Sequence, residues 1–109
     1  MIYHWCDRGD WEETGEAYTA PSLMEEGFIH FSYKHQVART ASATDPGHQN
    51  LVLLCVDESD LEVVDEDCYD LGEKYPHVYS PIPVASVIRV LPFPSRPDGT
   101  FRLPEGLPD

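Results

Sequence analysis

The sequence predicts one α+β domain, and three features carry this prediction. Short apolar runs typical of strands occur near the start, in the middle and towards the end of the chain, and one helical repeat lies among them. Strands and helices alternate only at first and several strands then follow, an order typical of an α+β domain rather than a doubly wound sheet. The 109 residues, 41% of them hydrophobic, are enough to bury one core without disulfide or metal support.

The first predicted elements are a strand and a short helix. Residues 1–6, MIYHWC, alternate in character, so His4 and Cys6 share one face of the expected strand. Asp7 can cap a helix that carries the next tryptophan and ends near Gly15.

A connector, a second strand and a longer helix are expected next. Residues 17–26 are interpreted as a connector, and Gly27 introduces a strand over 28–32, FIHFS. Ser32 closes that strand and is predicted to cap a helix over 33–43, whose small apolar residues recur at helical spacing.

The middle of the chain predicts a loop, a buried strand and an acidic segment. Residues 44–50, TDPGHQN, have loop composition. Residues 51–56, LVLLCV, form a continuous apolar run that is typical of a strand buried on both faces. The acidic segment 58–74 is expected to hold one short strand, at 61–64.

Two strands and an irregular tail complete the prediction. The strands are expected at 77–80 and 84–93, and the prolines of 81–83 between them indicate a bend or a sheet edge. The domain is placed at residues 1–92, and the proline-rich tail 93–109 is expected to be irregular and mobile.

Charge and composition exclude several classes of partner. The formal net charge of −13 argues against nucleic acid or an anionic membrane, because binding phosphate polymers requires clustered cations. No apolar run approaches the roughly 20 residues that span a bilayer. The chain begins directly with strand-like residues and shows no basic leader, so a cytoplasmic location is expected. Cys6, Cys55 and Cys68 are odd in number and lack CxxC spacing, which favours free or buried thiols over disulfides.

Three apolar runs each contain one histidine, and these histidines are the main functional candidates. Strand alternation places His30 with Ser32 on one face, and His77 with Tyr79 on another. If the two faces meet, they form a polar patch. The alternative is that each imidazole is partly buried and hydrogen-bonded to the backbone. The other two histidines, His35 and His48, are assigned to the surface.

The sequence patterns that would indicate other kinds of site are weaker. A zinc site could draw on His4, Cys6, His30 and His77, but the spacing of the first two is not a recognised zinc pattern, and no metal is assigned. Neither glycine-rich nucleotide fingerprint occurs, and Ser32 lies outside any nucleophile elbow.

Four segments resemble the small bacterial domain-of-unknown-function family 952. They are IYH at 2–4, PSLMEEGFIHFS at 21–32, LVLLCVD at 51–57 and YPHVYSPIP at 75–83. The resemblance implies a fold similar to the ADP-ribosyltransferases, with a split antiparallel β core around a cleft and two short helices. It brings no established reaction.

The element order also resembles the catalytic domain of poly(ADP-ribose) polymerases. That resemblance implies that His4 holds the dinucleotide and that His30 and Ser32 stand beside the nicotinamide ribose. The third motif of those enzymes supplies a glutamate, whereas this chain has His77 at that place. Glu66 in the preceding segment is the carboxylate that could replace it.

The sequence therefore supports three hypotheses of different classes. The first is an ADP-ribosyltransferase-like domain that binds NAD or a related ribose-phosphate nucleotide. If it is catalytic, glycosidic or phosphate transfer is expected, with His30 or His77 as general acid or base. His4, Ser32 and Tyr79 are the expected ligand-binding residues in its cleft. The second is a non-enzymatic ligand-binding or protein-interaction module on the same fold, and the third is a metal-supported hydrolase. Whether the protein is an enzyme stays open at this point.

Overall fold

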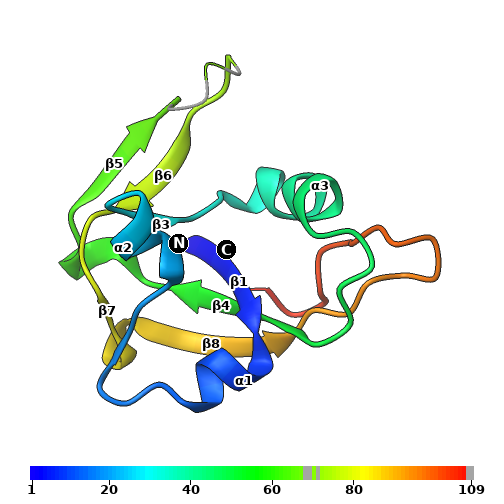
Figure 1. The fold of residues 1–109 in the computed structure, drawn as a ribbon, viewed down its shortest axis with the longest axis horizontal. Coiled ribbons are helices and arrows are strands. Elements are labelled where there is room, and N and C mark those ends of the chain that lie inside the picture. The colour runs from blue at the N-terminus through cyan, green and yellow to red at the C-terminus, as the bar shows by residue number, and fades with distance from the viewer. Residues whose placement is uncertain (68–69, 71, 108–109) are drawn as a thin grey trace.

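The computed structural model describes residues 1–67, 70 and 72–107, and within them it shows small antiparallel sheets and short helices (Figure 1). The mixture confirms the predicted α+β class. Cys68, for which a free or buried thiol was predicted, lies outside the described residues. The strands are β1 (Ile2–Asp7), β2 (Ala17–Tyr18), β3 (Ile29–His30), β4 (Leu51–Val56), β5 (Val63–Glu66), β6 (Tyr75–Val78), β7 (Ile82–Pro83) and β8 (Val87–Pro92), and the helices are α1 (Arg8–Glu12), α2 (Pro21–Glu25) and α3 (Lys34–Thr44).

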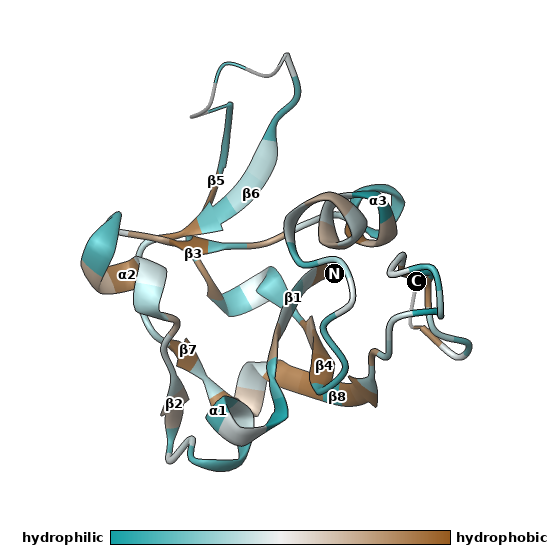
Figure 2. Ribbon diagram, turned by 45° about the vertical axis from the view of Figure 1, so that its right-hand side comes forward, coloured by the Kyte–Doolittle hydropathy of each residue, from teal (hydrophilic) through white to brown (hydrophobic). Residues whose placement is uncertain are grey.

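Three sheets are formed by the described strands. The central sheet has the order β1-β4-β8, the side sheet has the order β3-β6-β5, and β2 pairs with β7 in a two-stranded ribbon. Neighbouring strands are antiparallel in each of them. In Figures 1 and 2, β5 and β6 project away from the central sheet, and Figure 2 shows β4 and β8 in hydrophobic colours and β5 mostly in hydrophilic ones.

The central sheet separates two hydrophobic cores, as the continuous apolar run of β4 predicted. Val52, Leu54 and Val56 point into one core, together with residues of the side sheet and of the β2-β7 ribbon. Residues 51, 53 and 55 point into the other core, where Val37 of α3 packs. All six β4 residues are buried, and alternate side chains of one strand therefore hold the two halves of the molecule together.

One bridge connects the central and side sheets. The amide of Tyr3 donates to the carbonyl of Ser32 at 2.9 Å, and the amide of Ser32 donates back at 2.8 Å. This bridge corrects the prediction that Ser32 caps the following helix. Tyr33 is the N-cap residue instead, and its amide donates to the side chain of Gln36 at 2.9 Å.

The expected connector is the largest correction to the predicted elements. Residues 17–26 contain β2 and α2, so the described part of the chain has three α-helices rather than the two that were expected. Tyr18 lies in a strand because it pairs with Ile82, a residue that is 64 positions later in the sequence. Neither segment shows a local pattern long enough to reveal this pairing.

Several boundaries also differ from the prediction. The short acidic-segment strand begins at Val63 rather than at residue 61, and β6 covers Tyr75–Val78 rather than 77–80. The last strand is Val87–Pro92, and a 3₁₀ turn at Val84–Ser86 precedes it. Asp7 does cap α1, because its side chain accepts from the amide of Gly9 at 2.9 Å.

In the described part of the tail, residues 93–107, no helix or strand is formed, and several side chains pack against the rest of the protein. Phe93 and Phe101 are buried in the core beneath α3, with their ring centroids 4.8 Å apart. The guanidinium of Arg89 donates to the carbonyl of Gly106 at 2.7 Å. These contacts join the described part of the tail to the domain.

None of the helices in the described ranges has both the length and the apolar composition that crossing a bilayer requires.

Candidate functional site

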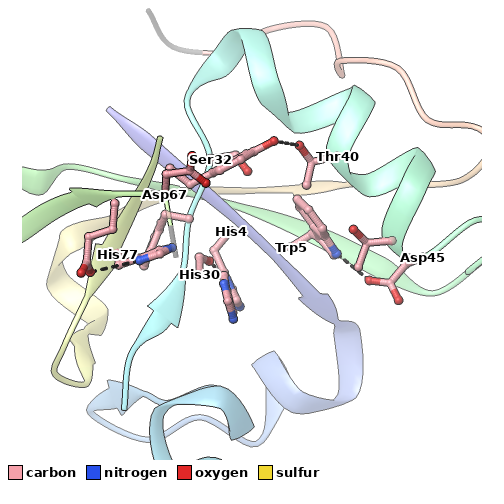
Figure 3. Close-up of a pocket in the computed structure, with 12 residues that line it drawn as sticks. His4, Trp5, His30, Ser32, Thr40, Asp45, Asp67 and His77 are labelled. Atoms are coloured by element: carbon pink, nitrogen blue, oxygen red, sulfur yellow. Dashed lines mark hydrogen bonds and ion pairs between the residues drawn. The ribbon is translucent and has the colours of Figure 1, made fainter. Parts of the chain in front are cut away.

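A pocket of about 410 Å³ opens where the central sheet, the side sheet and α3 meet (Figure 3). Its volume falls in the range of about 300–1,000 Å³ that is usual for small-molecule sites. In Figure 3 the side chains of Trp5 and Asp45 lie on one side of it and His77 lies on the other. We call it the histidine pocket, and its lining residues are His4, Trp5, His30, Phe31, Ser32, Thr40, Thr44, Asp45, Glu66, Asp67, Tyr75 and His77.

The side sheet places His30 and His77 directly opposite each other. They form a cross-strand pair between β3 and β6, and their ring centroids are 5.5 Å apart in an edge-on arrangement. Phe28 packs on both rings, stacked on His77 with centroids 4.1 Å apart and edge-on to His30 at 4.8 Å. Two imidazoles therefore border one cavity with a fixed relative orientation.

His77 forms a pair with the carboxylate of Glu66 on the neighbouring strand β5. Nδ1 of His77 lies 3.2 Å from Oε1 of Glu66, and the imidazole is only 1% exposed. The hydroxyl of Tyr79 donates to the same carboxylate oxygen. These two contacts, that of Tyr79 first, hold the pKa of Glu66 below its usual range. The carboxylate is therefore ionised at neutral pH, and it orients the imidazole with Nδ1–H as the donor.

His30 pairs with a carboxylate as well, but nearer to solvent. Its Nε2 lies 2.9 Å from Oε2 of Glu26, which follows α2, and its side chain is 36% exposed. The pocket thus carries two histidine–carboxylate pairs, one buried and one half-buried. A histidine oriented by a carboxylate is a common arrangement for moving protons near neutral pH.

His4 lines the same pocket, yet the protein uses both of its ring nitrogens. Nδ1 donates to the carbonyl of His30 at 2.6 Å, so Nε2 is the acceptor for the hydroxyl of Tyr18 at 2.7 Å. Burial lowers its pKa from 6.5 to about 4. His4 is therefore a neutral structural imidazole that joins β1, β2 and β3.

The other two predicted ligand-binding residues lie in different places. Ser32 is buried and lines the pocket. Tyr79 is half exposed and lies outside the lining, where its hydroxyl contacts Glu66 and its ring lies against Phe28, with the ring centroids 5.4 Å apart. The predicted surface positions of His35 and His48 are confirmed, since both are exposed.

The side of the pocket that faces the histidines was not predicted from the sequence. Nε1 of Trp5 donates to the carboxylate of Asp45 at 2.8 Å, at the end of α3. The hydroxyls of Thr40 and Tyr75 are 3.2 Å apart on the α3 side. A tryptophan near the start of the chain and an aspartate in a loop carry no local signal of this contact, because the packing of α3 on β1 creates it.

Metal and thiol chemistry receive no support from the described residues. Among residues 1–67, 70 and 72–107, no group of three or more histidine, cysteine, aspartate or glutamate side chains is placed to hold a metal ion. Burial raises the pKa of the Cys6 thiol to about 11, and the thiol of Cys55 is shifted to the same value by the same cause. Thiols of this kind are poor nucleophiles.

Comparisons with known proteins agree with the segments quoted above. Residues 5–90 match the family described as "Protein of unknown function (DUF952)". The chain belongs to this family. The crystal structure of protein CC0527 from Caulobacter crescentus is 30% identical, with a TM-score of 0.84 over 94% of this chain and 93% of that chain. The solution NMR structure of the same protein is 29% identical, with a TM-score of 0.74 over 91% and 89% of the two chains. No curated protein matches the sequence.

The histidine pocket of this DUF952 chain contains a small set of functional groups. It offers two oriented imidazoles, an ionised glutamate, two further carboxylates and aromatic walls. These groups can accept and donate protons, and the carboxylates can stabilise positive charge.

Proposed function

We propose that the histidine pocket binds the ribosyl end of NAD or of a related ribose-phosphate nucleotide and supports glycosidic transfer on an ADP-ribosylation-like fold. The observation that carries this proposal is the carboxylate of Glu66, which stands beside His77 in a pocket that His30 also borders. In this interpretation Glu66, from the strand next to β6, takes the place of the glutamate that transferases of this kind carry at His77. The split between the central and side sheets, with a pocket where they meet, is compatible with such a fold.

The chemistry is the cleavage of a bond between a ribose carbon and a pyridinium nitrogen. As the C1′–N bond breaks, its electron pair moves to the nitrogen, which leaves as neutral nicotinamide. The ribose carbon acquires oxocarbenium character, and an ionised carboxylate stabilises that positive charge. Water or another hydroxyl then bonds to C1′, and its proton passes to an imidazole.

His77 and His30 have distinct roles in this scheme. His77 donates through Nδ1 to Glu66, so its Nε2 is the basic nitrogen. His30 is half exposed and paired with Glu26, which suits exchange of a proton with solvent. Ser32, buried in the lining, can hydrogen-bond a ribose hydroxyl.

Amide chemical-shift titration with NAD, ADP-ribose and nicotinamide, combined with an assay of nicotinamide release, tests the proposal. We expect shifts that cluster around His30 and His77. In Glu66→Gln, whose amide oxygen can still accept from Tyr79, release should fall by about 100-fold, far more than the binding of NAD weakens. Glu62→Gln, an exposed residue outside this pocket, makes the same charge change and should leave release intact. No shifts at millimolar ligand would reject the proposal.

A second candidate is a non-enzymatic ligand-binding or interaction module on the same fold. It is favoured by the contacts that His30 and His77 make with carboxylates of the protein itself, since such pairs can serve stability alone. Binding without any nicotinamide release by the unaltered protein would select this candidate over the enzyme.

A further inference from the structure

Carboxylates are a prominent feature of the histidine pocket. It contains the three carboxylates of Asp45, Glu66 and Asp67, and among the lining residues that the structure describes there is no lysine or arginine. The chain as a whole carries a formal charge of −13. Charges in a concave site of low dielectric act on a ligand more strongly than charges on an open surface.

Arg39, which precedes the lining residue Thr40 on α3, is engaged elsewhere. Arg39 projects from α3 with a side chain that is 62% exposed, and its guanidinium lies 2.6 Å from the carboxylate of Glu73. It does not line the pocket. A phosphate inside the cavity would therefore meet three carboxylates and, among the described lining residues, no lysine or arginine.

The walls suit a flat cation. Trp5, Phe31 and Tyr75 contribute aromatic surface to the lining. The indole N–H of Trp5 holds the carboxylate of Asp45 at 2.8 Å, so a negative group is fixed beside an aromatic wall. A cation next to an aromatic face and a carboxylate is attracted by both.

We infer that the pocket recognises a positively charged N-ribosyl pyridinium and leaves phosphate groups outside, in solvent. This inference rests on the proposed function and names its substrate class: a cationic nucleoside, or the cationic end of a nucleotide. Cleavage of the C1′–N bond converts the pyridinium into neutral nicotinamide. The charge that holds the substrate disappears in the product, so the product leaves readily.

The affinities of four compounds test the inference: nicotinamide riboside, nicotinamide mononucleotide, NAD and NADH. The riboside should bind about tenfold more tightly than the mononucleotide at low ionic strength, and this ratio should shrink as salt screens the charges. NAD should bind more tightly than NADH, whose ring is neutral on the same ribose and phosphates.

A matched pair of variants shows whether the pocket itself makes the distinction. In Asp45→Asn the side-chain oxygen can still accept from Trp5, but the charge is lost, so the riboside should bind several-fold more weakly. Asp65→Asn removes one charge from an exposed residue that accepts from the Tyr33 hydroxyl outside the pocket, and it should leave the ratio unchanged.

Each failure points to a different error. If the mononucleotide binds as tightly as the riboside at low salt, or if the two variants have equal effects, the inference about charge is wrong while the proposed function stands. If none of the four compounds binds at millimolar concentration, the proposed function and this inference fall together.

Discussion

His4 and the pair formed by His30 and His77 come from similar sequence contexts and have different surroundings. Each lies in a short apolar run, and each lines the same pocket. Both ring nitrogens of His4 are hydrogen-bonded within the protein, one to a backbone carbonyl and one to the Tyr18 hydroxyl. His30 and His77 each face a carboxylate.

The difference teaches what separates a structural histidine from a candidate catalytic one. Burial alone does not, because His77 is more deeply buried than His4. The partners differ: Nε2 of His4 accepts from the Tyr18 hydroxyl, which opposes protonation of that nitrogen, whereas His30 and His77 each face a carboxylate. The following predictions test this distinction, starting from the largest effect on stability.

Replacing His4 should damage the fold most. His4→Ala removes the ring that packs on Tyr18 and Phe31. It also removes the hydrogen bonds that this ring makes with the Tyr18 hydroxyl and the His30 carbonyl. We expect the free energy of unfolding to fall by roughly 3–4 kcal/mol, as measured by urea denaturation. A loss below about 1 kcal/mol would show that His4 is not a structural residue.

The same residue should make the protein sensitive to mild acid. Because the pKa of His4 falls from 6.5 to about 4 on folding, the unfolded chain binds more protons between those pH values. The free energy of unfolding should therefore drop by about 3 kcal/mol as the pH is lowered through this window. Thermal unfolding at pH 7, 6, 5 and 4.5 measures it. His4→Gln should flatten the profile; an unchanged profile in that variant would assign the effect to other groups.

Removing one oxygen from the partner of His4 should have a smaller effect. Tyr18→Phe keeps the buried ring but leaves Nε2 of His4 without its donor. We expect a loss of about 1–2 kcal/mol, the usual cost of an unsatisfied buried polar group. Tyr33→Phe, which removes the hydrogen bond to the exposed Asp65, is the matched control and should cost less.

His30→Ala should weaken ligand binding more than it lowers stability, the reverse of His4→Ala. Its ion pair with Glu26 is partly exposed on both sides, so the loss in stability should stay within about 0.5–1 kcal/mol. Affinity for nicotinamide riboside should nevertheless fall at least several-fold, as chemical-shift titration can measure. A variant that is unstable but still binds would reverse the roles assigned to His4 and His30.

Local patterns in the sequence were enough to predict much of the framework. The apolar run of β4, the alternation of β1 and the Asp7 cap each depend on neighbours within a few residues, and all three are confirmed. The segments around His30 and His77 also gave the family. Alternation placed His30 and Ser32 on one face, and both line the pocket.

The tertiary structure alone decided which of these residues act together. Strand alternation has a period of two and is local, but register is set by the apolar side chains that must meet in the core. That register puts His30 opposite His77 and Glu66 beside both His77 and Tyr79. In the same way, the packing of α3 on β1 brings Asp45 to Trp5. Tyr18, which pairs with β7 as part of β2, donates to His4. A sequence can show that three imidazoles lie in apolar runs, whereas the fold brings together the partners of His4, which are a carbonyl 26 residues and a hydroxyl 14 residues away in the chain.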